Sequence, residues 1–356
     1  MSRVVLVGYQ GMGNLGDEAI LSGIEELLTG SGVEVIAVAT GGRGPIAAFP
    51  NAERVPTPRF LPGRAMRRVL RRADLMVFAG GGLLNDQWPT LIPRLLTWTM
   101  VARLLGARVG WLAAGVGPIR HRRSRWLARV VLGLASFVSV RDHASAALVR
   151  SMRGGEEPGV LPDPALFLPT PAPRSDPRGL ALVVRGLAPG GGDQGAVATA
   201  LAEWAAAERA SGAEVTLVSL QAGEDEPMIG QVNATMSSAG GAPLTSRALS
   251  ADPTTALAEL AGFEAVISMR LHGVLLAALA GRPWVAIAYD PKVAAAAAGL
   301  GRPGLALAVD GLTAAQLETA IAEARRPESA AMTAAAVAQA RGQRPAIQAW
   351  LGEVLA

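Results

Sequence analysis

The chain has 356 residues, half of them apolar, with a formal net charge of +4 and a mean hydropathy of +0.31. This length accommodates two domains that each bury a core, and the absence of cysteine excludes disulfides and thiolate metal sites. The longest apolar run, residues 95–114, is interrupted by Arg103 and Arg108, so no membrane span is expected and the default is a cytoplasmic protein.

The first half alternates short β-branched runs with helical patterns, which predicts a parallel sheet covered by helices. We expect glycine-rich turns after three of its strands and a surface loop over residues 41–63. Because ligands collect at the carboxyl ends of the strands in such sheets, these turns are candidate ligand contacts. The expected strands are residues 3–8, 33–40, 74–79 and 108–113 and a fifth that begins at residue 137. One helix is expected to end near residue 28, another to cover residues 90–105, and three more to follow residues 63, 120 and 142.

Residues 170–178 hold three prolines, as linkers do, and a second α/β half follows. We therefore expect one domain over residues 1–172, a second over 178–345, and a final helical segment, 346–356, that packs back on the body. Two open α/β sheets predict an active site in the cleft between the domains. The expected strands of this half are 180–185, 214–220, 243–249, 263–267 and 284–288, and its expected helices include 194–210, 253–262, 274–280, 292–298, 314–325, 328–341 and 347–354.

Ser268-Met269-Arg270-Leu271-His272-Gly273 stands at a predicted strand-to-helix turn. Ser268 is a plausible N-cap, and the free N–H groups of a helix N-terminus form an anion site. Arg270 adds a cation there and His272 a titratable imidazole. The combination suggests a phosphorylated or carboxylated substrate with a proton to move.

Lys292 is the single lysine of the chain, whose other 32 basic residues are arginines. It follows Tyr289, one of two tyrosines, in the sequence Tyr-Asp-Pro-Lys. A compact ammonium retained against such a bias indicates that lysine itself is needed, although a chance occurrence is the simpler alternative.

Further polar residues follow the glycine turns of the first half. Asp17 and Glu18 could serve chemistry or only cap a helix, and Arg141 is delivered to a turn by the strand that begins at residue 137. The histidines His121 and His143 are expected to be solvated, and no metal site is predicted. Candidate contacts to an acceptor are Asn14, Glu18, Asn85 and Asp86.

Positive charge is concentrated in two clusters. The second cluster, within residues 120–129, is interleaved with apolar residues around Trp126, as in a helix that lies on a membrane surface. A solvated helix face is an equal alternative. Few aromatic residues and no recognition module argue against nucleic acid. The clusters are Arg64, Arg67, Arg68, Arg71 and Arg72, then Arg120, His121, Arg122, Arg123, Arg125 and Arg129.

Six motifs in register resemble the polysaccharide pyruvyl transferase family, and within it the bacterial cell-surface-anchoring (CsaB-like) branch. They cover about residues 3–295. The motifs are Gly-Asn-Leu-Gly-Asp-Glu-Ala-Ile-Leu from Gly13, Gly-Gly-Gly-Leu-Leu-Asn-Asp from Gly80, Gly-Val-Gly-Pro from Gly115, Val-Arg-Asp from Val140, Met-Arg-Leu-His from Met269 and Tyr-Asp-Pro-Lys from Tyr289.

The resemblance implies a glycosyltransferase-B-like fold of two Rossmann-like domains. It also implies transfer of the enolpyruvyl unit of phosphoenolpyruvate, as co-substrate and without a cofactor, onto a sugar as a pyruvate ketal. In the branch named, the acceptor is a lipid-linked disaccharide containing N-acetylmannosamine, and the finished wall polymer anchors S-layer proteins. Donor contacts implied by the resemblance are Arg141, Arg270, His272 and Lys292, with His272 in proton transfer.

The chemistry of the residues agrees with these roles. Arginines suit both the carboxylate and the phosphate of the donor. His272 would protonate the vinyl carbon, while Asp17 or Glu18 would accept the hydroxyl proton or orient the sugar. Two alternatives remain: a nucleotide-sugar glycosyltransferase on the same fold, and a non-catalytic sugar-binding protein.

Contact with the inner membrane face is expected only as a peripheral one, and oligomeric state is not predicted.

Overall fold

The computed structural model describes residues 2–42, 44–57, 60–155, 157–172, 174–187 and 192–355. The chain divides into two compact units. Unit 1 comprises Met1–Gly13, Asp17–Leu168 and Gly342–Ala356, and unit 2 comprises Asn14–Gly16 and Pro169–Arg341. Each unit is built on one parallel sheet, as the alternation of strand and helix patterns predicts. Within the described part of the chain, no helix is long and apolar enough to cross a membrane.

Unit 1 contains a seven-stranded sheet in the order β3-β2-β1-β4-β5-β6-β7. The strand order reverses between β1 and β4, so this is the topological switch point of the sheet. Its central strands are buried on both faces, which explains their continuous apolar sequences. The strands are β1 (Ser2–Val7), β2 (Val33–Thr40), β3 (Glu53–Pro56), β4 (Leu75–Ala79), β5 (Arg108–Ala114), β6 (Phe137–Val140) and β7 (Gly159–Val160).

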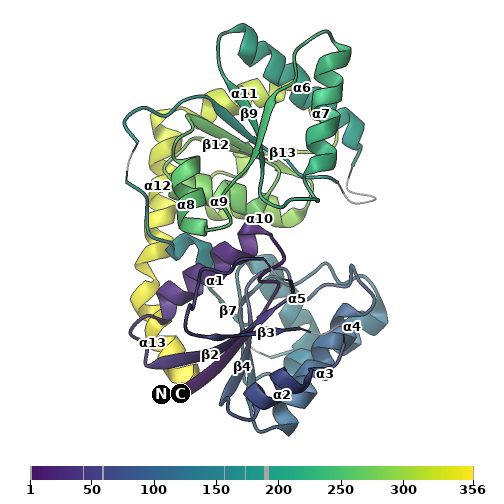
Figure 1. Cartoon of the computed structure of the whole chain (residues 1–356), viewed down its shortest axis with the longest axis vertical. Coiled ribbons are helices and arrows are strands. Elements are labelled where there is room, and N and C mark those ends of the chain that lie inside the picture. The colour runs from purple at the N-terminus through teal and green to yellow at the C-terminus, as the bar shows by residue number, and fades with distance from the viewer. Residues whose placement is uncertain are drawn as a thin grey trace. The chain divides into compact units, whose positions relative to one another are not determined.

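Helices cover both faces of this sheet, as Figure 1 shows. On one face α1 (Leu15–Leu28) and α13 (Arg344–Leu355) share a core that includes Ile24 and Leu351. On the other face, four helices pack in sequence order over a core that includes Trp98 and Val131. They are α2 (Arg64–Leu70), α3 (Leu91–Leu104), α4 (Arg122–Gly133) and α5 (His143–Arg153).

Unit 2 contains a six-stranded parallel sheet in the order β10-β9-β8-β11-β12-β13, and its switch point lies between β8 and β11. One face carries α6, α7 and α11, and the other carries α8, α9 and α10 (Figure 1). The strands are β8 (Leu180–Val183), β9 (Val215–Ser219), β10 (Thr245–Ala248), β11 (Ala265–Ser268), β12 (Trp284–Ala288) and β13 (Ala306–Ala308). The helices are α6 (Gln194–Ala210), α7 (Glu226–Ser238), α8 (Pro253–Leu260), α9 (Leu271–Leu279), α10 (Pro291–Gly299), α11 (Ala314–Ala324) and α12 (Pro327–Gly342).

Two expectations about secondary structure are wrong. The segment 41–63 is not only a loop, because β3 lies within it and pairs with β2. This strand is short, ends in Pro56 and stands at the sheet edge, where a missing N–H is tolerated, so its sequence carries little strand signal. In unit 2, α9 begins at Leu271 rather than at residue 274, which places His272 inside the first helical turn.

Candidate functional site

Polar side chains gather at the carboxyl ends of four adjacent strands of unit 2. Arg185 follows β8, Ser219 ends β9, Arg270 follows β11 and Tyr289 follows β12. Because parallel strands all end at the same edge, these residues share one edge that includes the switch point between β8 and β11. We refer to this group as the unit 2 edge site.

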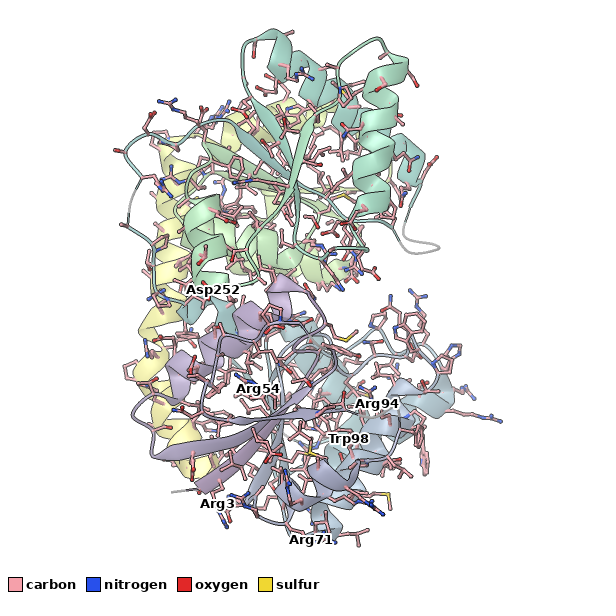
Figure 2. The ribbon with its side chains drawn as sticks, in the orientation of Figure 1. Arg3, Arg54, Arg71, Arg94, Trp98 and Asp252 are labelled. Atoms are coloured by element: carbon pink, nitrogen blue, oxygen red, sulfur yellow. The ribbon has the colours of Figure 1, made fainter. Side chains whose placement is uncertain are left out.

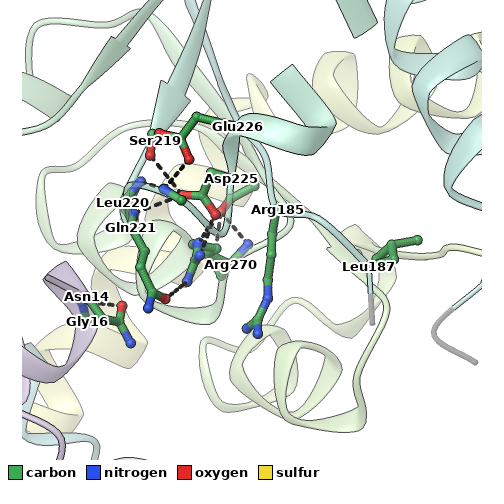
Figure 3. A network of polar contacts seen from close by, with 12 residues as sticks. Asn14, Gly16, Arg185, Leu187, Ser219, Leu220, Gln221, Asp225, Glu226 and Arg270 are labelled. Carbon is green, nitrogen blue, oxygen red and sulfur yellow. Dashed lines mark hydrogen bonds and ion pairs between the residues drawn. The ribbon is translucent and has the colours of Figure 1, made fainter. Parts of the chain in front are cut away.

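Arg270 is held in a buried ion pair with Asp225, which precedes α7. Asp225 is fully buried, and the Arg270 side chain is 7% exposed. The Nε of Arg270 donates to Asp225 Oδ1 at 2.9 Å, and its Nη1 donates to Gln221 Oε1 at 3.3 Å (Figure 3). These contacts fix the guanidinium in one orientation, because Nε and Nη2 both donate to Asp225 Oδ1 while Nη1 donates to Gln221 Oε1.

The second oxygen of Asp225 is saturated by three donors at the end of β9. Its Oδ2 accepts from Ser219 Oγ at 3.1 Å and from the backbone N–H groups of Leu220 at 2.8 Å and Gln221 at 2.9 Å. These donors fix the Asp225 carboxylate in place against the end of β9. Sequence reasoning missed Asp225, because the residue lies 45 positions before Arg270 and begins a segment that reads only as a polar helix.

Ser268 does not cap α9, contrary to the sequence interpretation. It is the last residue of β11 and is fully buried. Its Oγ accepts from the N–H of Arg270 at 3.0 Å and donates to the carbonyl oxygen of Arg270 at 2.8 Å. The N-cap residue is Arg270 itself, in an extended conformation. Ser268 therefore shapes the turn that presents Arg270 and His272.

His272 packs against Gly16 in the first turn of α9. A Cβ placed on Gly16 would lie 2.1 Å from His272 Nδ1, so any larger residue would displace the imidazole. Residues 14–16 belong to unit 2: Leu15 N–H donates to Leu220 O at 3.0 Å, and Asn14 forms a β-bridge with Gln221. The Asn-Leu-Gly part of the first motif is thus part of the unit 2 edge site (Figure 3).

Tyr289 is contacted by two cations. Arg185 Nη1 donates to the Tyr289 hydroxyl at 2.8 Å, and its guanidinium lies 5.4 Å from the ring centroid. Lys292 Nζ lies 5.9 Å from the same centroid and 3.4 Å from Asp290 Oδ2. Asp290 caps α10 by accepting the N–H of Lys292 at 3.0 Å. Sequence reasoning placed Arg185 only at the end of a strand and missed this contact.

Glu18 is a buried acid of unit 1. Its Oε1 accepts from the N–H of Gly11 at 2.6 Å, and its Oε2 is buried with no hydrogen bond within the described part of the chain. The pKa of Glu18 is raised to about 7: burial and, less strongly, the charge of Asp17 raise it, whereas the Gly11 N–H and Arg54 lower it. A carboxyl group with such a pKa can exchange a proton near neutral pH.

Asp17 is buried next to Glu18 at the same switch point. Its Oδ1 lies 3.1 Å from where a Cβ on Gly81, in the turn after β4, would stand. Burial raises the pKa of Tyr9, which follows β1; the cation of Arg94 lowers it, and the charge of Asp17 raises it. The ends of β1 and β4 therefore form a second polar group, which we refer to as the unit 1 edge site.

Asn85 and Asp86 are engaged in the local structure of unit 1. Asn85 Nδ2 donates to Gly82 O at 2.6 Å and its Oδ1 accepts from Gln87 N–H at 3.0 Å. Asp86 Oδ2 accepts from the N–H groups of Arg120 at 2.7 Å and His121 at 2.8 Å. Both side chains thus organise the loops at the ends of β4 and β5.

Arg141 follows β6 in unit 1, so it is not part of the unit 2 edge site. Its side chain is 7% exposed, and its Nη1 lies 3.1 Å from Asp163 Oδ2. Asp142 caps α5 by accepting the N–H of Ser145 at 2.7 Å, as one sequence interpretation expects. Arg141 Nε makes no hydrogen bond among the described residues, but it lies 3.9 Å from Asp142 Oδ2 in an ion pair.

Chemically, the unit 2 edge site offers fixed cations, a helix N-terminus and an imidazole. This set suits an anionic substrate that undergoes proton transfer. The unit 1 edge site offers two carboxyl groups that could bind or deprotonate hydroxyls. No group of three or more metal-ligating His, Asp or Glu side chains is present among residues that the structure describes.

The solved structures that resemble this chain share its fold at low identity. A glycosyltransferase from Rickettsia africae aligns with a TM-score of 0.61 and 9% identity over 99% of this chain and 97% of that one. The UDP-GlcNAc 2-epimerase from Methanocaldococcus jannaschii aligns with a TM-score of 0.58 and 11% identity over 92% of this chain and 94% of that one. The UDP-GlcNAc 2-epimerase from Neisseria meningitidis, bound to UDP-GlcNAc, aligns with a TM-score of 0.56 and 11% identity over 94% of each chain. The fold is thus glycosyltransferase-B-like, with two parallel α/β sheets.

The search of curated proteins found no match. A model of one protein family does match: polysaccharide pyruvyl transferase, over residues 14–291 of the 356. The match extends from the Asn-Leu-Gly segment to the start of α10 and so includes Asp17, Glu18, Arg270 and His272. The chain belongs to the polysaccharide pyruvyl transferase family.

Proposed function

We propose that this chain transfers the enolpyruvyl group of phosphoenolpyruvate to two hydroxyls of a sugar and so forms a pyruvate ketal. The observation that carries the proposal is the unit 2 edge site, where the fixed guanidinium of Arg270 and the His272 imidazole stand at the N-terminus of α9. Phosphoenolpyruvate carries a phosphate and a carboxylate, and such a cationic site suits both groups.

Arg185 and Lys292 extend this cationic site. Arg185 is oriented by its hydrogen bond to Tyr289, and Lys292 lies near the same ring. We propose that Arg185, Arg270 and Lys292 bind the anionic groups of the donor. Ser268 contributes through the turn that it shapes, and Arg141 is proposed as a further donor contact from unit 1.

The reaction needs one proton at the vinyl carbon and loss of phosphate from the neighbouring carbon. We propose that His272 delivers that proton as the methyl group forms, and that the first sugar hydroxyl attacks the carbon that becomes cationic. The second hydroxyl then displaces phosphate. Of the two hydroxyl protons released in the reaction, one returns to His272 and the other leaves with phosphate. Asp17 is proposed as the base. Glu18, Asn14, Asn85 and Asp86 are proposed to bind or order the acceptor side.

The acceptor that we propose is a lipid-linked disaccharide containing N-acetylmannosamine, used in a secondary cell-wall polymer that anchors S-layer proteins. This finer assignment comes from the six motifs and their resemblance to the cell-surface-anchoring branch. It is tested by acceptor competition: N-acetylmannosaminyl acceptors should support turnover, and galactosyl acceptors should not. The reverse preference would assign the chain to another branch.

Phosphate release tests the reaction itself. Wild type should release phosphate from phosphoenolpyruvate only when acceptor is present, and His272→Ala should lower the rate about 100- to 10,000-fold while donor binding persists. His143→Ala is a matched control, because His143 lies exposed at the start of α5. Unchanged turnover in His272→Ala would remove the assigned role. Turnover of a nucleotide sugar without phosphoenolpyruvate would favour glycosyl transfer.

A further inference from the structure

Charge is strongly segregated along this chain. Residues 60–134 contain thirteen arginines, no lysine or glutamate, and two aspartates, which gives a net formal charge of +11. The whole chain carries +4, so the remaining residues carry −7. The fold brings this basic segment to one face of unit 1, because α2, α3 and α4 pack side by side over the same face of the sheet.

The outer side of α3 and α4 also exposes large apolar side chains. Leu104 is 82% exposed, Trp126 64% and Met100 50%. The two helices pack against each other, and Arg103 Nη1 donates to Leu134 O at 3.1 Å, which ties the end of α3 to the end of α4. We refer to the outer surface of these two helices as the α3–α4 face.

Exposed arginines surround these apolar residues. Arg122, Arg123 and Arg129 of α4 are exposed, and none of them is paired with a carboxylate in the part of the chain that the structure describes. A further exposed cation of this basic segment is Arg71, at the end of α2 (Figure 2). Solvent-facing helices normally mix both charge signs, so an uncompensated basic face with exposed Trp and Leu indicates a partner.

We propose that the α3–α4 face binds the surface of an anionic lipid bilayer. The arginines would contact lipid phosphates, while Trp126, Leu104 and Met100 would enter the boundary between headgroups and acyl chains. The apolar residues favour lipid over nucleic acid, because phosphate-backbone binding uses the cations alone and gains nothing from exposed Leu or Met. The proposal rests on unit 1 alone and does not depend on the reaction proposed for the chain.

Vesicle sedimentation tests this proposal with the full chain. Wild type should sediment with phosphatidylglycerol-containing vesicles, less with pure phosphatidylcholine, and less as salt rises. The triple variant Arg122→Gln, Arg123→Gln, Arg129→Gln should bind anionic vesicles roughly 100-fold more weakly, since each surface cation contributes about one kcal/mol near such a membrane. The double variant Leu104→Ser, Trp126→Ser should weaken binding at high salt as well, since it removes the apolar part.

A second triple variant, Arg153→Gln, Arg247→Gln, Arg326→Gln, is the matched control. It removes the same charge from exposed positions outside the α3–α4 face and should bind vesicles nearly as wild type does. Thermal unfolding of all variants shows whether they are folded. Equal loss in the control, or equal binding by wild type and both face variants, would overturn the proposal. So would tight binding of a DNA duplex with no binding to vesicles, which would identify a nucleic-acid surface.

Discussion

The two edge sites occupy equivalent positions at the switch points of two similar sheets, yet they are built in opposite ways. In unit 2, each of two cations is held by a specific partner: Arg270 by Asp225 and Arg185 by Tyr289. In unit 1, the acid Glu18 is buried, one of its oxygens has no hydrogen bond from any residue that the structure describes, and its pKa is raised to about 7. The first arrangement suits a fixed anion site, and the second suits an exchangeable proton. The same topology therefore supports complementary chemistries.

The largest effect should follow loss of the partner that fixes Arg270. Asp225→Ala would leave a buried, unpaired guanidinium, so we expect unfolding to become easier by about 3–5 kcal/mol. Asp252→Ala is the control, because Asp252 only caps α8 by accepting Thr255 N–H at 2.7 Å, and its loss should cost about 1 kcal/mol. Denaturant unfolding measures both. Similar losses in the two variants would show that the ion pair contributes little.

Gly16→Ala should disturb the position of His272. Because the added methyl would overlap the imidazole, we expect kcat to fall about 100-fold, the effect of roughly a 1 Å misplacement of a reacting group. Gly230→Ala in α7 is the control, since, beyond its own helical turn and chain neighbours, no atom of the described residues lies within 4 Å of its added methyl. Steady-state kinetics with phosphoenolpyruvate would measure the change. A Gly16→Ala enzyme with normal kcat would contradict the positioning role.

Removing Arg185 should have a smaller effect on donor binding. Arg185→Gln should raise the KM for phosphoenolpyruvate about tenfold and change kcat less, as expected for loss of one charge-assisted hydrogen bond. Arg247→Gln provides a matched control, because Arg247 lies 4.9 Å from the centroid of Phe263 in a similar contact. If both substitutions change the KM equally, Arg185 has no special place in the anion site.

The smallest expected effect is a change in how stability depends on pH. The pKa of Glu18 is raised from 4.5 to about 7 by folding, so the folded protein binds more protons than the unfolded chain between these values. Stability contributed by Glu18 is therefore lost as pH rises through this window. Relative to Glu18→Gln, wild type should have a higher Tm at pH 5 than at pH 8. Glu34→Gln is the control, because it removes the same carboxylate charge from an exposed residue of β2. A pH-independent difference between wild type and Glu18→Gln would refute the shift.

Much of the fold follows from sequence periodicity. The expected strand at 284–288 and helix at 194–210 match β12 and α6, because both are bounded by clear turn residues. The short strands β3, β7 and β13 were not predicted. With two to four residues each, they form through pairing with a neighbouring strand, which no local pattern encodes.

The candidate site was predictable only where its residues are local. The strand-to-helix turn at Arg270 and His272 is confirmed, because a β-branched run and an apolar helix flank it. Asp225 and the grouping of Asn14–Gly16 with unit 2 arise from contacts between segments distant in sequence. Such contacts depend on how the strands are ordered in the sheet, and a single sequence does not specify that order.

Product analysis tests the central claim most directly. Phosphoenolpyruvate labelled with carbon-13 at its vinyl carbons would be incubated with the chain and an N-acetylmannosaminyl acceptor, and the product examined by NMR. Ketal formation predicts a methyl signal and a tetrahedral carbon bonded to two oxygens, and His272→Ala should form this product at least about 100-fold more slowly. A product that retains the vinyl carbons, or an acceptor that never gains label, would contradict the account.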